Sequence, residues 1–596
     1  MVRRLRAGEM SDLVAESEGW GIEAGYHDVF GHWHAVPKDT IERLVESLRR
    51  GGVSPVEAVA EPALADHDRA FQGDGRRVWG LAAQLYALRS ARNWGHGDFG
   101  DLKRLVEIAA PFGAAAIGLN PLHALFPDDA ERASPYGPNS RLFLNVLYID
   151  VSAIPEFDGL TPAEAKEAAR LRNLELIDYA AVAKLKLAAL ARAYDGFRAK
   201  ATAERQADFR AFREEQGEAL LRFCCFEVLR RQFSPRPWPE WPAPWHTPDK
   251  AALAEFCEQH EFACGFVAFC QWIADRQLAA CKETARELGM TVGLYVDLAV
   301  GIDRHGADAW SDQDTVLADV SVGAPPDEFN PMGQDWGLAP FHPSRIAADD
   351  FAALRRLLRA TMRHAGAVRI DHVLGLKRMF LMPVGAGAKN GAYVRYPFEA
   401  MLRVIAEESR SARCVVIGED LGTVPEGFRD TMMRWGLWTY RVVLFERRQD
   451  GEFAAPQTYP EQALATFNTH DLPTFRGWIT GHDLRTKNEI GIDPGETAEA
   501  RTWWQGALRR LLSEFGGGRS SEDFAAAAAV LGATPSRLAM VGLDDVVGGL
   551  DQTNIPGTLA EHPNWRRKLP LNIEDLAGLP DLAAVAEAFA EAGRKV

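Results

Sequence analysis

Four acidic side chains stand at the ends of short apolar runs, where carboxylate chemistry could be concentrated. Asp297 closes one such run, and Asp371, Glu419 and Asp471 follow three others. If these runs are strands of one parallel barrel, their carboxyl ends open onto the same face. Cleaving a glycosidic bond with retention needs one carboxylate to attack the anomeric carbon and one carboxylic acid, about 5 Å away, to protonate the departing oxygen. The four residues therefore predict a site for chemistry of this kind.

Arg369 lies two residues before Asp371 and so on the same face of that strand, where its charge could hold the carboxylate ionised. Each of these strand-end motifs is short enough to occur by chance when taken alone. A carboxylate at a strand end is often only a helix cap or an ion-pair partner, and Arg369 could serve a structural ion pair. Asp544 and Asp545 follow the last apolar run, and we interpret them as part of a loop or helix cap outside the site.

Eight short apolar runs are each followed by a longer helical pattern, and this alternation is typical of βαβ units around a parallel sheet. Eight is the number that closes a barrel. The sequence therefore predicts an α/β fold, a (β/α)8 TIM barrel. The predicted strands are Val78–Leu85, Ala115–Leu119, Val292–Leu298, Ala367–Ile370, Val415–Gly418, Tyr440–Phe445, Leu464–Asn468 and Leu538–Leu543.

The remaining segments predict additions to this barrel. Residues 1–75 read as a small helical N-terminal extension, and the barrel occupies 76–596 with a helical insertion at about 155–260, between the second and third strands. Proline-dense residues 235–242 predict a rigid surface loop. Trp238 and Trp241 within it could bind a second sugar chain, but the favoured interpretation is a loop that covers the core.

Composition narrows the class of protein. A chain of 596 residues with 47% hydrophobic and 25% charged residues is an ordinary globular composition, and the formal charge of -16 argues against binding to nucleic acid or anionic membranes. Residues 1–10 do not read as a secretory signal, and the longest apolar stretch, 262–274, is too short to span a bilayer. We therefore expect no membrane partner and a cytoplasmic location.

Cysteine and tryptophan usage fit that expectation. The seven cysteines are an odd number without any C-x-x-C pair, which predicts reduced thiols and no metal site. The 16 tryptophans suit sugar rings, whose apolar faces stack on flat aromatic side chains.

Longer motifs identify a family. From about residue 79 to 569 the chain resembles the 4-α-glucanotransferases, also called amylomaltases or disproportionating enzymes, of glycoside hydrolase family 77 in the α-amylase clan. The N-terminal extension resembles that of bacterial members of the maltose-utilisation type. The resemblance rests on Asn93–Gly95, Ser134–Ser140, Gly293–Gly301, Ser321–Asp327, Gly333–Gly337, Arg369–His372, Gly418–Gly422, Thr469–Thr474, Asn554–Thr558 and Asn564–Trp565.

The resemblance implies roles for individual residues. Asp371 matches the nucleophile that forms a covalent β-glucosyl intermediate, Glu419 the general acid/base, and Asp471 the carboxylate that grips the 2- and 3-hydroxyls of the distorted sugar. A loop at about 321–340 matches the lid over the acceptor side. The substrate-binding residues implied in addition are Tyr136, Asp297, Arg369, His372, His470, Phe329, Trp336, Asn554 and Pro556.

The family resemblance also implies what such a protein binds. We expect α-1,4-glucan and maltooligosaccharide substrates, no organic cofactor, no catalytic metal, and a monomer or homodimer. Simpler interpretations stay open: His372 and His470 could be core histidines, Tyr136 could merely pack in its turn, and Asp297 could only orient its neighbours. The rival functions are an α-glucan hydrolase on the same fold and a non-catalytic glucan-binding barrel.

Overall fold

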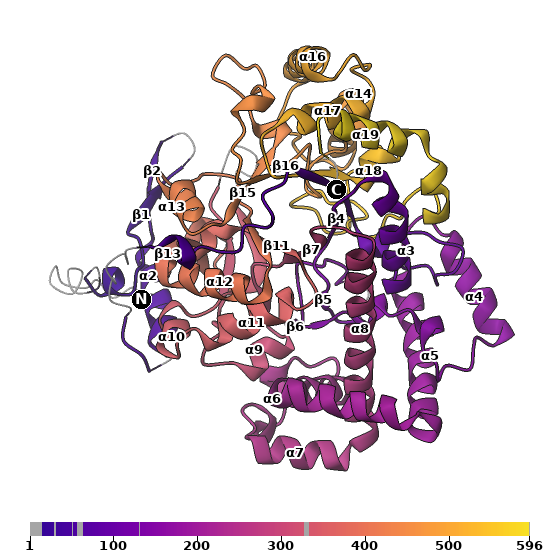
Figure 1. Ribbon diagram of the computed structural model, residues 1–596. Coiled ribbons are helices and arrows are strands. Elements are labelled where there is room, and N and C mark those ends of the chain that lie inside the picture. Colours follow the sequence, from indigo (N-terminus) through magenta and orange to yellow (C-terminus); the bar gives the residue numbers. More distant parts are fainter. Residues whose placement is uncertain are drawn as a thin grey trace.

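Eight parallel strands close into a barrel in the computed structural model, which describes residues 13, 15–28, 31–50, 52–55, 64–129, 132–326 and 333–594. The order around the barrel is β11-β14-β15-β16-β17-β3-β4-β7, so the predicted (β/α)8 fold is confirmed (Figure 1). The strands are β3 (Val78–Ala83), β4 (Ala116–Leu119), β7 (Gly293–Leu298), β11 (Ala367–Ile370), β14 (Val415–Gly418), β15 (Trp438–Val442), β16 (Ala463–Thr466) and β17 (Leu538–Gly542).

Each predicted run overlaps one barrel strand, and the sixth shows the largest shift. The strand β15 starts at Trp438, before the predicted run, and ends at Val442, after which Val443–Phe445 forms a 3-10 turn. The ladder with β16 stops at Val442, and the amide of Glu446 then bonds back to the carbonyls of Val442 and Val443. An apolar run continues through this turn, so the sequence pattern could not show where the strand stops.

Helices cover the outer face of the barrel strands and side chains fill the barrel interior, so both faces are buried and the strands are almost continuously apolar. The α3 N-terminus is fixed by a capping box, in which Asp98 and Asp101 each accept a backbone N–H. Among the described residues no helix is both long and apolar enough to cross a membrane. The covering helices include α3 (Phe99–Ala109), α8 (Glu261–Glu287), α11 (Ala352–Met362), α12 (Phe398–Ala412), α13 (Phe428–Arg434), α17 (Phe524–Ala533), α18 (Leu543–Val546) and α19 (Pro580–Glu591).

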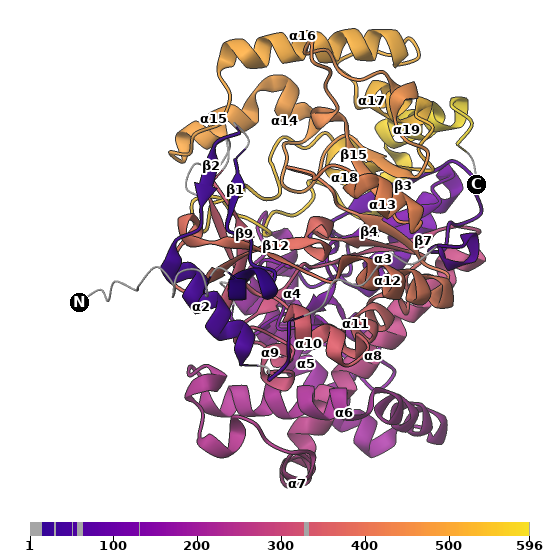
Figure 2. The ribbon, with the colours of Figure 1, turned by 90° about the vertical axis from the view of Figure 1, so that its left-hand side faces the viewer.

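The helices α6 (Ala203–Phe233) and α7 (Lys250–Gln259) lie at one end of the molecule, and a second helical group lies at the opposite end (Figure 2). The proline-dense loop lies in the first group, where Trp238 is 9% and Trp241 3% exposed. Trp241 packs on Phe226 and Trp310, so these rings cover the core and do not form a sugar-binding surface. The helices α4 (Pro162–Asn173) and α5 (Tyr179–Lys200) precede this first group in sequence, and the second group comprises α14 (Phe475–Thr480), α15 (His482–Glu489) and α16 (Ala498–Phe515).

The segment predicted as a lid contributes two strands to a five-stranded sheet beside the barrel mouth. Its order is β13-β12-β9-β10-β8, and β9 and β10 are antiparallel. Phe329, predicted to bind substrate, lies outside the described residues. The strands are β8 (Ile302–Asp303), β9 (Val320–Ala324), β10 (Gln334–Ala339), β12 (Arg378–Pro383) and β13 (Ala392–Arg395), and the short helices α9 (Ala307–Ser311) and α10 (Pro343–Ala348) flank it in sequence.

The N-terminal extension contains strands as well as a helix. The antiparallel pair β1 (Gly25–His27) and β2 (Trp33–Ala35) precedes α2 (Lys38–Arg49). The α2 residue Thr40 donates a hydrogen bond to the carbonyl of Asn390, and Ile22 forms a β-bridge with Val394. The extension therefore packs against the sheet that carries the lid strands. A further short pair, β5 (His123–Ala124) and β6 (Ser140–Leu144), brackets the loop that holds Tyr136.

Candidate active site

The four predicted carboxylates converge at the carboxyl end of the barrel because neighbouring strands run in register. Within the ladders, Arg369 pairs with Asp297 and Ile370 with Gly418. Asp371 and Glu419 are the next residues of β11 and β14, so they leave adjacent strands at the same level. Asp471 follows β16 on a short loop.

Arg369 is the electrostatic centre of this site. Its Nη1 donates to both Asp297 carboxylate oxygens at 2.8 Å, and its Nη2 lies 2.9 Å from Asp371 Oδ1. Burial opposes the charge of Arg369, but Asp297 and Asp371 outweigh it and hold its pKa well above the ordinary value. The guanidinium thereby fixes the direction in which Asp371 points.

The same Nη2 atom lies 3.7 Å from Glu419 Oε2. Since Asp371 Oδ1 is 2.9 Å from that nitrogen, the two carboxylate oxygens are separated by no more than the sum of these distances. This geometry accommodates the separation of about 5 Å that retaining glycosidases use.

Two backbone amides hold Glu419 in place. Its Oε2 accepts the amide N–H of His372, and its Oε1 accepts that of Leu421, each at 2.9 Å. His372 has a φ of +47°, a left-handed conformation that non-glycine residues rarely adopt, and this conformation accompanies the bond to Glu419. A strained backbone thus accompanies the positioning of the acidic group.

The electrostatic surroundings of Glu419 favour its neutral form. Burial raises its pKa to about 7, and the negative charge of Asp371 adds to the increase, while Arg369 and the two amides act in the opposite direction. A carboxyl group with this pKa holds its proton near neutrality and can release it, as a general acid must.

Asp471 has surroundings of the opposite kind. Burial favours its neutral form, but His470 and Asn554 outweigh this effect and lower its pKa, so it stays ionised. Asn554 Nδ2 donates to its Oδ1 at 2.6 Å, and His470 Nε2 lies 3.3 Å from its Oδ2. Its side chain is still 44% exposed, which leaves room for a hydroxyl of a ligand.

An aromatic cluster forms one wall of the site. Tyr136 donates its hydroxyl to Asp297 Oδ2 at 2.6 Å and stacks on His470 with ring centroids 4.7 Å apart. Trp565 lies 5.5 Å from Tyr136 and 5.3 Å from His470. Burial is the main reason that the pKa of Tyr136 lies well above its ordinary value, so the hydroxyl remains a hydrogen-bond donor.

The lid sheet reaches the site through Trp336. This β10 residue packs edge-on against His372 with ring centroids 5.1 Å apart. Burial lowers the pKa of His372, so its imidazole is neutral at pH 7. Pro556 is partly exposed two residues after Asn554 on the same loop.

Some residues around the site were not selected from the sequence. Trp565 appeared only within a family motif, and Gln552, which donates to the carbonyls of Asp471 and Asn554, had no signal of its own. Asp544 lines a cavity together with Tyr136 and Arg369, and burial raises its pKa to about 6. Asp544 closely follows the barrel strand β17, and this position could have identified it as part of the cavity.

Asp545, which the sequence interpretation placed outside the site, lines the same cavity as Asp544. Its side chain also accepts the amide N–H of Phe475, the first residue of α14, while Thr474 is the N-cap of that helix.

Comparison with known proteins agrees with this geometry. The family model described as 4-alpha-glucanotransferase matches residues 83–572. A 4-alpha-glucanotransferase of Mycobacterium tuberculosis is 39% identical over 546 residues, covering 86% of this chain and 75% of that protein. One of Haemophilus influenzae is 35% identical over 577 residues, covering 91% and 80%.

A solved structure supports the same assignment. The crystal structure of amylomaltase from Corynebacterium glutamicum aligns with a TM-score of 0.85 and 27% identity, covering 97% of this chain and 99% of that one. The family model spans most of the chain, and both curated relatives exceed 30% identity over most of its length. The chain therefore belongs to the 4-alpha-glucanotransferase family.

Proposed function

We propose that this member of the family transfers glucan segments by double displacement, with Asp371 as nucleophile and Glu419 as general acid/base. In the first step, Asp371 Oδ forms a bond to the anomeric carbon while the bond from that carbon to the leaving glucan's 4-oxygen breaks. Glu419 gives its proton to that oxygen, so the leaving chain departs as a neutral alcohol. The observation that carries this proposal is that both carboxyl groups lie beside the same atom, Arg369 Nη2, at 2.9 Å for Asp371 and 3.7 Å for Glu419.

The second step reverses the proton movement. The 4-hydroxyl of an acceptor glucan attacks the anomeric carbon, its proton passes to Glu419, and the bond to Asp371 breaks. The negative charge of Asp371 helps to raise the pKa of Glu419. Esterification of Asp371 removes that charge, so the pKa of Glu419 falls at the point where Glu419 must act as a base.

The other predicted residues act on the sugar. Asp471, ionised and partly exposed, would accept hydrogen bonds from the 2- and 3-hydroxyls of the distorted ring. His372 and His470 would bond hydroxyls on either side of the cleaved bond. Tyr136 and Asp297 would support the donor ring, and both contact other members of the site.

Four further residues would complete the binding surface: Trp336 and Phe329 in the lid, and Asn554 and Pro556 on one loop. Trp336 connects the lid sheet with His372, and the predicted lid, residues 321–340, would close over the acceptor side. Excluding water preserves the covalent intermediate until a glucan hydroxyl arrives. We therefore assign to this lid the control over whether the intermediate reacts with a glucan hydroxyl or with water.

The wider context follows from the same proposal. The substrates are maltooligosaccharides and other α-1,4-glucans, and the protein acts as a monomer or homodimer in the cytoplasm. All seven cysteines are free, which suits a reducing compartment. The division into an extension at 1–75 and a barrel at 76–596 is kept as a proposal.

Product analysis separates this proposal from its rivals. The purified protein is incubated with maltotriose, and the products are resolved by chain length. Transfer yields a ladder with members longer than the substrate, whereas a hydrolase yields only shorter products. A non-catalytic barrel leaves maltotriose unchanged. Asp371→Asn serves as the control, because removing the nucleophile abolishes every product if the proposal holds.

A further inference from the structure

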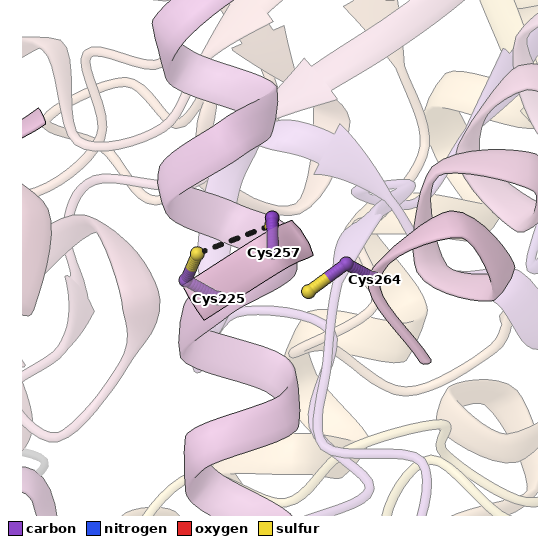
Figure 3. Close-up of side chains that lie close together, drawn as sticks. All are labelled: Cys225, Cys257 and Cys264. Carbon is purple, nitrogen blue, oxygen red and sulfur yellow. Dashed lines mark hydrogen bonds between the residues drawn. The ribbon is translucent and has the colours of Figure 1, made fainter. Parts of the chain in front are cut away.

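Three cysteines from three helices meet in the helical insert. Cys225 belongs to α6, Cys257 to α7 and Cys264 to α8. Their sulfur atoms all lie within 4.8 Å of one another, and those of Cys225 and Cys257 are 3.4 Å apart. Figure 3 shows the side chains gathered where the helices meet, with Cys264 pointing toward the other two.

This spacing fits a tetrahedral metal ion. With a Zn–S bond of about 2.3 Å, two thiolates on one tetrahedral zinc have sulfur atoms about 3.8 Å apart. The observed separations bracket that distance. One ion could therefore contact all three sulfur atoms after side-chain adjustments of a few tenths of an ångström.

The surroundings of the three cysteines leave one of them accessible and place positive charge nearby. Cys225 and Cys264 are buried, whereas Cys257 is partly exposed and leaves a path for an ion. The charge of Arg213 and the imidazole of His260 act on Cys257 and favour a negative charge there. Arg213 also balances the net negative charge of three thiolates around a divalent cation.

We propose that Cys225, Cys257 and Cys264 form a structural site for a thiophilic divalent cation of the Zn²⁺ class, with water as the fourth ligand beside Cys257. Binding exchanges the thiol protons for the ion and involves no oxidation. The site would tie α6, α7 and α8 together at the end of the molecule shown in Figure 1, and it is independent of the glucan chemistry.

The spacing of these cysteines along the chain forms no zinc-type motif, so the sequence predicts no metal here. Cys225 stands 32 residues before Cys257. The competing use of the same residues is a disulfide between Cys225 and Cys257. That bond requires an oxidant and sulfur atoms about 2.05 Å apart, and it leaves Cys264 unused. The two possibilities differ in metal content and in mass.

Metal loading of the full chain tests the proposal. The reduced protein is equilibrated with ZnCl₂, freed of unbound metal by gel filtration and analysed by mass spectrometry for zinc. We expect about one ion per chain, and a decrease of at least tenfold in Cys257→Ser and Cys264→Ser. Cys270→Ser is the matched control, since Cys270 is a buried cysteine of α8 outside the cluster, and it should retain the ion.

Two measurements on the unmodified chain keep the test independent of folding defects. Replacing zinc with cobalt(II) should produce thiolate-to-cobalt charge-transfer absorption, and zinc should slow alkylation of the partly exposed Cys257 at least tenfold relative to protein treated with a chelator. A chain that emerges without zinc, equal zinc in parent and Cys257→Ser, or a Cys225–Cys257 disulfide in the reduced preparation would overturn the proposal.

Discussion

Replacing Glu419 with glutamine removes the proton that the leaving glucan needs while keeping the shape of the side chain. With a pKa of about 7, Glu419 is about nine-tenths protonated at pH 6, whereas an ordinary glutamate, with a pKa of about 4.3, would be only about 2% protonated. At pH 6 the protonated fraction of Glu419 is therefore roughly fifty times that of an ordinary glutamate. General acid–base groups contribute about 10²- to 10⁴-fold to rates, so we expect transfer from maltotriose to fall by that factor in Glu419→Gln.

The assay compares two donors. Maltotriose needs a protonated leaving group, but maltosyl fluoride does not, because fluoride departs as a stable anion. Glu419→Gln should therefore react with the fluoride and accumulate a covalent glycosyl group on Asp371, visible as added mass on the peptide that contains it. Equal losses on both donors, or parental activity on maltotriose, would refute the role assigned to Glu419.

The raised pKa of Glu419 also predicts two pH dependences. For the parent, kcat/KM on maltotriose should fall as pH rises through about 7, because Glu419 loses its proton. For stability, a carboxyl whose folded pKa is raised contributes stability that is present below its unfolded pKa and lost as pH rises through the folded one. Glu419→Gln should thus be more stable than the parent toward urea at pH 8, with the difference vanishing near pH 4. A less stable variant at pH 8 would contradict this electrostatic account.

Three further substitutions test other parts of the site. Arg369→Met leaves Asp297 buried without its partner, so the free energy of unfolding in urea should fall by about 3–5 kcal/mol. Asn554→Ala removes a hydrogen bond to the charged Asp471, worth about 1.5–3 kcal/mol, so kcat/KM on maltotriose should fall about 10- to 100-fold. Trp336→Ala opens the lid contact, so the share of glucose and maltose released by hydrolysis should rise relative to longer products, measured by chromatography.

Matched controls separate these effects from general damage. Arg448→Met breaks an exposed ion pair and should cost no more than about 1 kcal/mol. Asn390→Ala removes an exposed hydrogen bond in the turn between β12 and β13, and Trp503→Ala alters an exposed ring on α16. If a control matches its paired site variant, the corresponding role is wrong.

The sequence alone determined the barrel and the chemical groups that it carries. Short apolar runs alternating with helical patterns located all eight strands, because strand and helix periodicity are local properties. The position of Asp371 and Glu419 directly after two of those runs was enough to predict that they share one mouth. In a parallel barrel all strands have their carboxyl ends at the same face, so residues that follow two strands must lie at that face.

Local patterns were less informative where segments meet from a distance. The N-terminal segment contains the pair β1–β2 as well as the predicted helix, and Tyr26 of this hairpin packs on Phe380 of β12 and Tyr393 of β13, more than three hundred positions later. The end of β15 was likewise set by its ladder with β16. Neither feature has a local signal, since both depend on which partner strand is available.

Only the tertiary structure decided the environment of each group. Arg369 joins Asp297, Asp371 and Glu419 because three strands lie side by side in one register, and burial at that point raises the pKa of Glu419. Trp565 reaches His470 from almost a hundred residues away. A sequence specifies which ionisable groups exist, but a pKa and a contact depend on the distances and burial that long-range packing creates.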